Sequence, residues 1–298
     1  MLTDRYPNIK IALGNLDSLA VLKTESVAAD IVVHAADADH FASAEAIISA
    51  LAASQKPSFL IHTSGTAVLY DTAAPQTLGR AVTPDKRYND VTDLSAITSF
   101  PATHIHRTVD ALVLAAPACV RTAIVCPPAV YGAGSGPGNT TAQQIPMLVA
   151  ATAARGRAFV VRDGANSASF VHACDLGRAY LALVEAAARG GQGADWDALG
   201  YYFVDGVEAA WKDVVVAVAA EMKKNGIALE DGIDSVTPEE ADELCPYGAF
   251  IFGVNMHGHG ERARKVLGWV PQEAGLFESI AEPVRLEAEK LRAGKVAA

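Results

Sequence analysis

Short runs of β-branched and apolar residues alternate with longer amphipathic stretches along the first half of the chain. The runs of strand length lie at residues 9–13, 29–36, 58–63 and 120–125. Between them, residues 41–53 and 106–116 carry small and apolar side chains at helical spacing. Continuous apolar runs of this length are typical of strands buried on both faces of a parallel sheet. The alternation therefore predicts an α/β fold with a doubly wound parallel sheet.

The second half of the chain has a different pattern. A glycine-rich loop at residues 132–138 precedes a predicted helix over 141–155. Short predicted strands follow at 159–161 and 170–172. Further helices are predicted over 175–189, 211–224, 262–267 and 279–292. We expect these elements to build a smaller C-terminal lobe that covers a substrate.

Composition and charge narrow the class of protein. The net charge of -10 argues against nucleic acid as a partner, because phosphate binding needs basic surfaces. No run approaches the ~20 apolar residues that span a bilayer, and the start of the chain does not read as a signal peptide, so no membrane is predicted. The 4 cysteines are widely spaced, which favours a reduced, cytoplasmic protein. A small-molecule substrate is the expected partner, with a homodimer left open.

Five motifs in register carry a family resemblance. They are Ala29-Asp-Ile-Val-Val-His-Ala-Ala36, Ile61-His-Thr-Ser-Gly65, Ala123-Ile-Val-Cys-Pro-Pro128 with Val130-Tyr-Gly132, Phe170-Val-His-Ala-Cys-Asp175 and Ala263-Arg-Lys-Val-Leu-Gly-Trp-Val-Pro271. In this order the chain resembles an extended, atypical short-chain dehydrogenase/reductase of the NAD-dependent epimerase/dehydratase type. The resemblance implies a Rossmann-like domain over 1–130 and a mainly substrate-binding lobe over 131–298 with returning sheet elements. It also implies NAD or NADP as cofactor, although the residues leave open that there is none.

One departure from the family lies at the start of the chain. The resemblance implies that residues 9–13 form the third strand of the sheet, so the first βαβ unit and its glycine-rich phosphate turn are missing. The first strand is normally central, and its loss would leave unpaired backbone groups. We therefore expect either a shortened start or a gap closed by rearrangement or by a partner chain.

A second departure alters the family's catalytic Tyr-x-x-x-Lys helix. The tyrosine position holds His106 and the lysine position holds Asp110, one helical turn apart. A carboxylate can orient an imidazole, and an imidazole transfers protons near neutral pH. The hypothesis is that His106 is the acid/base and that Asp110 orients it. The alternative is a histidine at a helix N-terminus beside a surface ion pair of Asp110 with Arg107.

Other candidate residues stand at the carboxyl ends of the predicted strands, where ligands bind in such sheets. Ser64 and Thr66 could hold a reacting oxygen beside His106, although turn chemistry also explains them. The pattern Gly258-His-Gly260-Glu-Arg-Ala263 fits a dinucleotide turn only formally. No metal site is predicted, because neither His-x-His pair has a clear third ligand. Cofactor contacts are expected from Asn15, Asp17, Ala35, Ala36, Thr63 and Pro127, and substrate contacts from Tyr131 and Asn255.

These features predict a small-molecule enzyme that resembles NAD(P)-dependent epimerases, dehydratases and reductases, with acid/base chemistry at an altered Tyr-Lys site. One alternative is a cofactor-independent isomerase, cyclase or lyase on a degraded reductase scaffold. The other is a non-catalytic protein that keeps the fold and senses a ligand.

Overall fold

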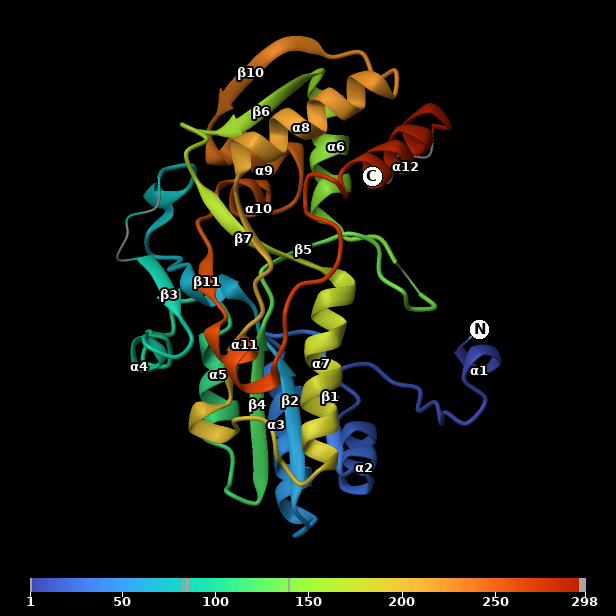
Figure 1. The fold of residues 1–298 in the computed structure, drawn as a ribbon, viewed down its shortest axis with the longest axis vertical. Coiled ribbons are helices and arrows are strands. Elements are labelled where there is room, and N and C mark those ends of the chain that lie inside the picture. The colour runs from blue at the N-terminus through green and yellow to red at the C-terminus, as the bar shows by residue number, and fades with distance from the viewer. Residues whose placement is uncertain (1, 82, 84–85, 139, 295–298) are drawn as a thin grey trace.

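The computed structural model describes residues 2–81, 83, 86–138 and 140–294, and its centre is a parallel sheet (Figure 1). The sheet has four strands in the spatial order β1-β2-β4-β8. Every neighbouring pair in it is parallel. This confirms the predicted α/β fold with a parallel central sheet. The strands are β1 (Ile31–His34), β2 (Ser58–Thr63), β4 (Val120–Cys126) and β8 (Tyr201–Phe203).

Helices cover both faces of this sheet, as the strand pattern predicts. In β2, Leu60 packs into one apolar cluster, whereas Phe59 and Ile61 pack into the cluster on the opposite face. Alternating side chains point to opposite faces of a strand, so β2 is buried on both sides. One face carries α2 (Leu19–Ala28), α3 (Phe41–Ala53) and α5 (Arg107–Leu114), and the other carries α7 (Ala173–Ala188) and α11 (Glu261–Leu267).

A second apolar core lies beyond the carboxyl ends of the central strands, in the upper part of Figure 1. Its largest fully buried side chain is Trp211, which packs edge-on against Phe170 and Phe252. Strands β5 (Ala129–Tyr131), β7 (Ser167–His172) and β9 (Val207–Ala210) form one sheet here, and β6 (Arg157–Val161) pairs with β10 (Glu230–Val236). The helices are α6 (Gln144–Arg155), α8 (Trp211–Lys224), α9 (Pro238–Leu244), α10 (Gly248–Gly253) and α12 (Ala281–Arg292).

Several short elements complete the fold. Strand β3 (Arg87–Asn89) pairs in parallel with β11 (His257–His259). The others are α1 (Leu2–Arg5), α4 (Leu94–Ile97) and the 3-10 turns η1 (Thr66–Leu69), η2 (Pro75–Thr77) and η4 (Asp197–Leu199). Among the described helices, none has the length and apolar character needed to cross a bilayer.

The predicted strand over residues 9–13 is wrong. The segment is irregular, and Leu13 is 87% exposed. An apolar run becomes a strand only where a neighbour completes its backbone hydrogen bonds and an apolar face covers its side chains. In the described part of the chain, β1 pairs only with β2, and residues 9–13 do not reach its other edge. The predicted helices over 41–53 and 211–224 are confirmed at both ends.

Candidate active site

The candidate site forms where the segments after β2 and β4 meet. The backbone N–H of Ser64 donates to the carbonyl of Val125 at 2.8 Å, and that of Thr66 donates to the carbonyl of Pro127 at 2.9 Å. Both hydroxyl-bearing residues are buried. His106 stands directly before α5, with a left-handed φ of 64°. The structure therefore brings three of the predicted catalytic residues to one edge of the sheet.

Gly65 lets the His106 ring approach this backbone. A Cβ at Gly65 would lie 3.1 Å from Nε2 of His106, tighter than an ordinary contact. The other ring nitrogen, Nδ1, lies 2.9 and 3.0 Å from the two carboxylate oxygens of Asp39. A carboxylate on Nδ1 fixes the ring and places the exchangeable proton of a neutral imidazole there, so Nε2 can act as the acceptor. Nε2 is thus the nitrogen that faces the segment between Ser64 and Thr66.

Asp39 makes the contact with His106 that was expected of Asp110. The signal for it was available, because Asp39 follows β1 closely at the same edge of the sheet as Ser64. The sequence could not reveal which of the acidic residues after that strand would reach His106.

Asp110 is instead the buried partner of Ser64. Its Oδ2 accepts hydrogen bonds from the Ser64 hydroxyl at 3.0 Å and from the Tyr201 hydroxyl at 2.8 Å. Burial raises the pKa of Asp110 to about 6, against the opposing effect of these two hydrogen bonds. The surface ion pair with Arg107 does not form, since that guanidinium donates to the carbonyls of Thr98 and Phe100. The Asp110 carboxyl is therefore a proton-accepting group behind Ser64.

Replacing Asp110 by Asn should change how the free energy of unfolding depends on pH. The pKa of this carboxyl is about 6 in the folded protein, against an ordinary value of 3.8, so the folded state holds the proton more tightly. This contribution to stability is complete below the unfolded pKa and is lost as the pH rises through the folded one. In urea titrations, we expect the wild type to lose about 2 kcal/mol relative to Asp110→Asn between pH 4 and pH 7. A difference in stability between the wild type and Asp110→Asn that does not change with pH would contradict the raised pKa of this carboxyl.

A buried pair of histidines lies beside this site. His34 and His62 are register partners in β1 and β2, with their Nδ1 atoms 2.9 Å apart. Burial lowers the pKa of His62 to about 3 and also lowers the pKa of His34. Both rings are therefore neutral near pH 7, and one donates its Nδ1 proton to the other. The pair links two strands, and neither residue was singled out from the sequence.

Three of the predicted cofactor residues line one cavity. Asn15, Ala35 and Ala36 border a space of about 760 Å³ beside the outer edge of β1. Asp17 lies apart and pairs with His40 at 3.2 Å. The Thr63 hydroxyl is 2.5 Å from that of Tyr180, on the other face of the sheet, and Pro127 binds the backbone of Thr66. The six residues therefore do not form one contiguous surface.

The residues around this cavity do not fit a whole dinucleotide. A pyrophosphate needs basic side chains or the free N–H groups of a helix N-terminus. The only charged side chain on the described cavity wall is Glu25, and its carboxylate is ion-paired with Lys10 at 2.8 Å. The formal turn at Gly258 supplies no alternative: the N–H of Gly260 donates to Asp205 at 2.6 Å and that of Arg262 to Asp90 at 2.9 Å. Carboxylates of the protein itself thus occupy the start of α11.

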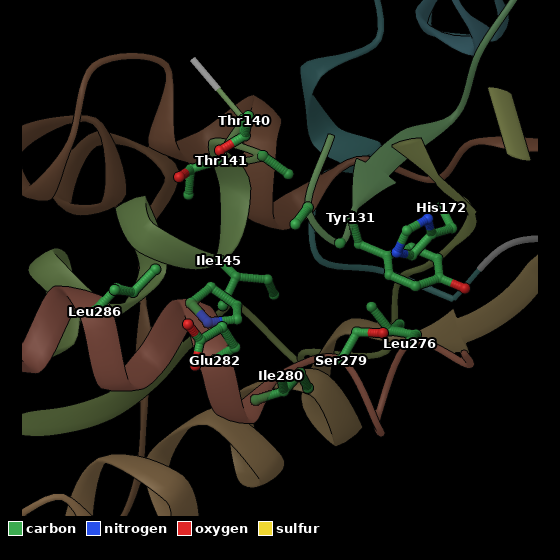
Figure 2. Close-up of a pocket in the computed structure, with 14 residues that line it drawn as sticks. Tyr131, Thr140, Thr141, Ile145, His172, Leu276, Ser279, Ile280, Glu282 and Leu286 are labelled. Carbon is green, nitrogen blue, oxygen red and sulfur yellow. The ribbon is translucent and has the colours of Figure 1, made fainter. Parts of the chain in front are cut away.

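The two predicted substrate residues lie on different cavities. Tyr131 lines a cavity of about 330 Å³, and its hydroxyl donates to the carbonyl of Ala274 at 3.1 Å (Figure 2). Asn255 lines a separate cavity of about 330 Å³. Its amide is bound on both sides, since it accepts from the N–H of Ser167 and donates to the carbonyl of Arg80. Within the described ranges, no three His, Cys, Asp or Glu side chains form a metal-binding group.

Comparison with known proteins agrees with this fold. Residues 4–198 match the model of the NAD dependent epimerase/dehydratase family. The chain is 33% identical over 304 aligned positions to the oxidase ucsJ of an Acremonium species, covering 97% of this chain and 87% of that protein.

Solved structures are similar in fold at low sequence identity. The dTDP-glucose 4,6-dehydratase DesIV of Streptomyces venezuelae, with NAD and DAU bound, is 15% identical, with a TM-score of 0.62 over 98% of this chain and 83% of that one. RMD of Pseudomonas aeruginosa, complexed with NADPH, is 15% identical, with a TM-score of 0.59 over 97% and 94%. UDP-glucose 4-epimerase of Thermotoga maritima, with UDP-glucose, is 12% identical, with a TM-score of 0.56 over 97% and 86%. With its family match over residues 4–198, the chain belongs to the NAD-dependent epimerase/dehydratase family.

Proposed function

We propose that the protein is an enzyme that moves a proton on a small-molecule carbonyl or alcohol at the site formed by His106, Ser64 and Thr66. The observation that carries the proposal is the Asp39–His106 pair, which turns Nε2 of the imidazole toward the backbone of Gly65. A fixed imidazole at the carboxyl end of a parallel sheet is suited to general acid/base catalysis.

The two hydroxyl groups have different parts in this proposal. Ser64 donates its proton to Asp110, so its oxygen keeps lone pairs that can accept a hydrogen bond from a substrate alcohol. Among the described residues, the Thr66 hydroxyl has one hydrogen-bond contact, a weak one of 3.8 Å to the thioether of Met256. It can therefore turn to donate to a substrate carbonyl while Nε2 of His106 takes or returns the proton.

NAD or NADP belongs to this proposal because the family is NAD-dependent and related folds hold NAD or NADPH. None of the described residues that line the candidate cavity is Lys or Arg. That observation favours a second candidate, a cofactor-independent isomerase, cyclase or lyase. Calorimetry of the 298-residue chain against NAD, NADH, NADP and NADPH separates the two. Micromolar binding supports the nucleotide-dependent enzyme, and no binding by a cooperatively folded protein supports the second candidate.

Removing the Asp39 carboxylate tests its part in positioning His106. We expect Asp39→Ala to lower kcat by about tenfold with little change in KM, since the imidazole loses its orientation but remains in the site. Steady-state kinetics on a substrate from a panel of ketones, aldehydes and alcohols would measure this. Asp30→Ala is the matched control, because Asp30 is also exposed and ion-paired, with Lys56, at the opposite end of β1. Equal kcat values for both variants would contradict the positioning role.

A further inference from the structure

The cavity beside Tyr131 has apolar walls contributed by several separate segments. Ile145 comes from α6, Leu276 and Ile280 from the segment before α12, and Leu286 from α12 itself. Figure 2 shows these side chains around the space, with the rings of Tyr131 and His172 together on one side of it. The two rings meet edge to face, with centroids 5.4 Å apart. A volume of about 330 Å³ and mainly apolar walls are typical of small-molecule sites.

His172 provides a hydrogen-bond donor at the edge of this cavity. The backbone N–H of Cys174 donates to Nδ1 of His172 at 3.1 Å, so the proton of the neutral ring is on Nε2. Nε2 lies against Gly132, where a Cβ would overlap the ring, and Gly132 is itself part of the cavity wall. The described residues give Nε2 no hydrogen-bond partner, so it can donate to a ligand.

The charge of the wall excludes phosphate-bearing ligands. None of the described residues that line the cavity is Lys or Arg. Its one carboxylate, Glu282, is ion-paired with Arg285 at 2.8 Å. A nucleoside diphosphate would lose its hydration here without gaining a basic partner. The site therefore differs in chemistry from one that holds a sugar nucleotide.

We propose that this cavity binds an uncharged, mainly apolar small molecule whose carbonyl oxygen accepts a hydrogen bond from Nε2 of His172. The apolar walls supply affinity by burying the body of the ligand, and the single donor fixes its orientation. The inference does not depend on proton transfer by His106.

The experiment uses prodan, an uncharged naphthalene ketone with solvent-sensitive fluorescence, and the full chain. We expect saturable binding with a blue-shifted emission. Ala142→Phe places a ring in the cavity and should weaken binding at least tenfold, whereas Ala188→Phe, at the exposed end of α7, should not. His172→Asn keeps an acceptor for the N–H of Cys174, but its side chain is too short to place a donor at the position of Nε2, so it should weaken binding about five- to tenfold.

Each result either supports or overturns the proposal. His106→Ala should bind prodan like the wild type, so a failure of the proposed catalysis leaves this test intact. Absence of saturable binding, or equal binding by the wild type and Ala142→Phe, would overturn the site. Displacement of prodan by UDP-glucose would show that the cavity accepts phosphate-bearing ligands and would overturn their exclusion. Unchanged binding by His172→Asn would overturn the assigned hydrogen bond. Circular dichroism establishes that each variant is folded before it is compared.

Discussion

Replacing His106 by Ala should lower kcat by about 10²- to 10⁴-fold, which is the usual contribution of a positioned general acid or base. His106 is the imidazole that Asp39 orients, with Nε2 beside the backbone of Gly65. KM should change little, because the remaining residues still bind the substrate. Steady-state kinetics measure the effect. His259→Ala is the control, since its side chain is 57% exposed and stands outside the site.

The double variant of His106 and Asp39 sharpens this prediction. If Asp39 acts only by orienting the imidazole, Asp39→Ala should not lower kcat further once His106 has been replaced by Ala. If the double variant instead shows the product of the two separate losses of kcat, Asp39 acts independently of His106. Full turnover by His106→Ala would rule out the proposed acid/base role.

Replacing Gly132 by Ala should destabilise the fold by about 3 kcal/mol, from backbone strain and overpacking together. Gly132 has a φ of 75°, and a Cβ there would overlap the imidazole of His172. Gly156 is a matched control, because its φ is 78° but no atom lies within 4 Å of the added Cβ. Gly156→Ala should therefore lower the free energy of unfolding only through backbone strain, by about 1 kcal/mol. Urea unfolding at pH 7 compares the two.

The difference between the two glycine variants isolates the contact with His172. Gly132→Ala should also weaken prodan binding, since the displaced ring carries the proposed donor, whereas Gly156→Ala should not. Equal losses of stability would mean that the loop after β5 moves away from His172 without cost.

The sequence predicted the central sheet well, because its strands have strong patterns of their own. Strand β2 (Ser58–Thr63) has the bounds expected from its apolar run, and outside the sheet helix α8 (Trp211–Lys224) has those expected from its amphipathic pattern. Strand β8 was missed, because Tyr201–Phe203 is too short to have a period and becomes a strand only by pairing with β4. Residues 9–13 show the reverse case, in which a local pattern without a neighbour does not form a strand.

The difference between local patterns and contacts with distant segments also explains which residues of the candidate site could be predicted. Ser64 and Thr66 could be placed beside His106 because strand ends meet at one edge of a parallel sheet. The spacing of His106 and Asp110 suggested one helical face, but the left-handed φ at His106 takes its side chain out of that face. Asp39 then reaches the ring from a loop distant in sequence, and no local pattern predicts such a contact.

The sheet and the lobe are interleaved along the chain, which affects how the protein emerges from the ribosome. Strands β1, β2 and β4 leave the ribosome first and can pair with one another. The edge of β4 that faces away from β2 stays unpaired until β8 has been synthesised. The core of the lobe includes both Ala129 and Val284, so it cannot close until α12 has been synthesised. Newly made chains therefore carry an unfinished lobe through most of translation, with apolar surface that chaperones can bind.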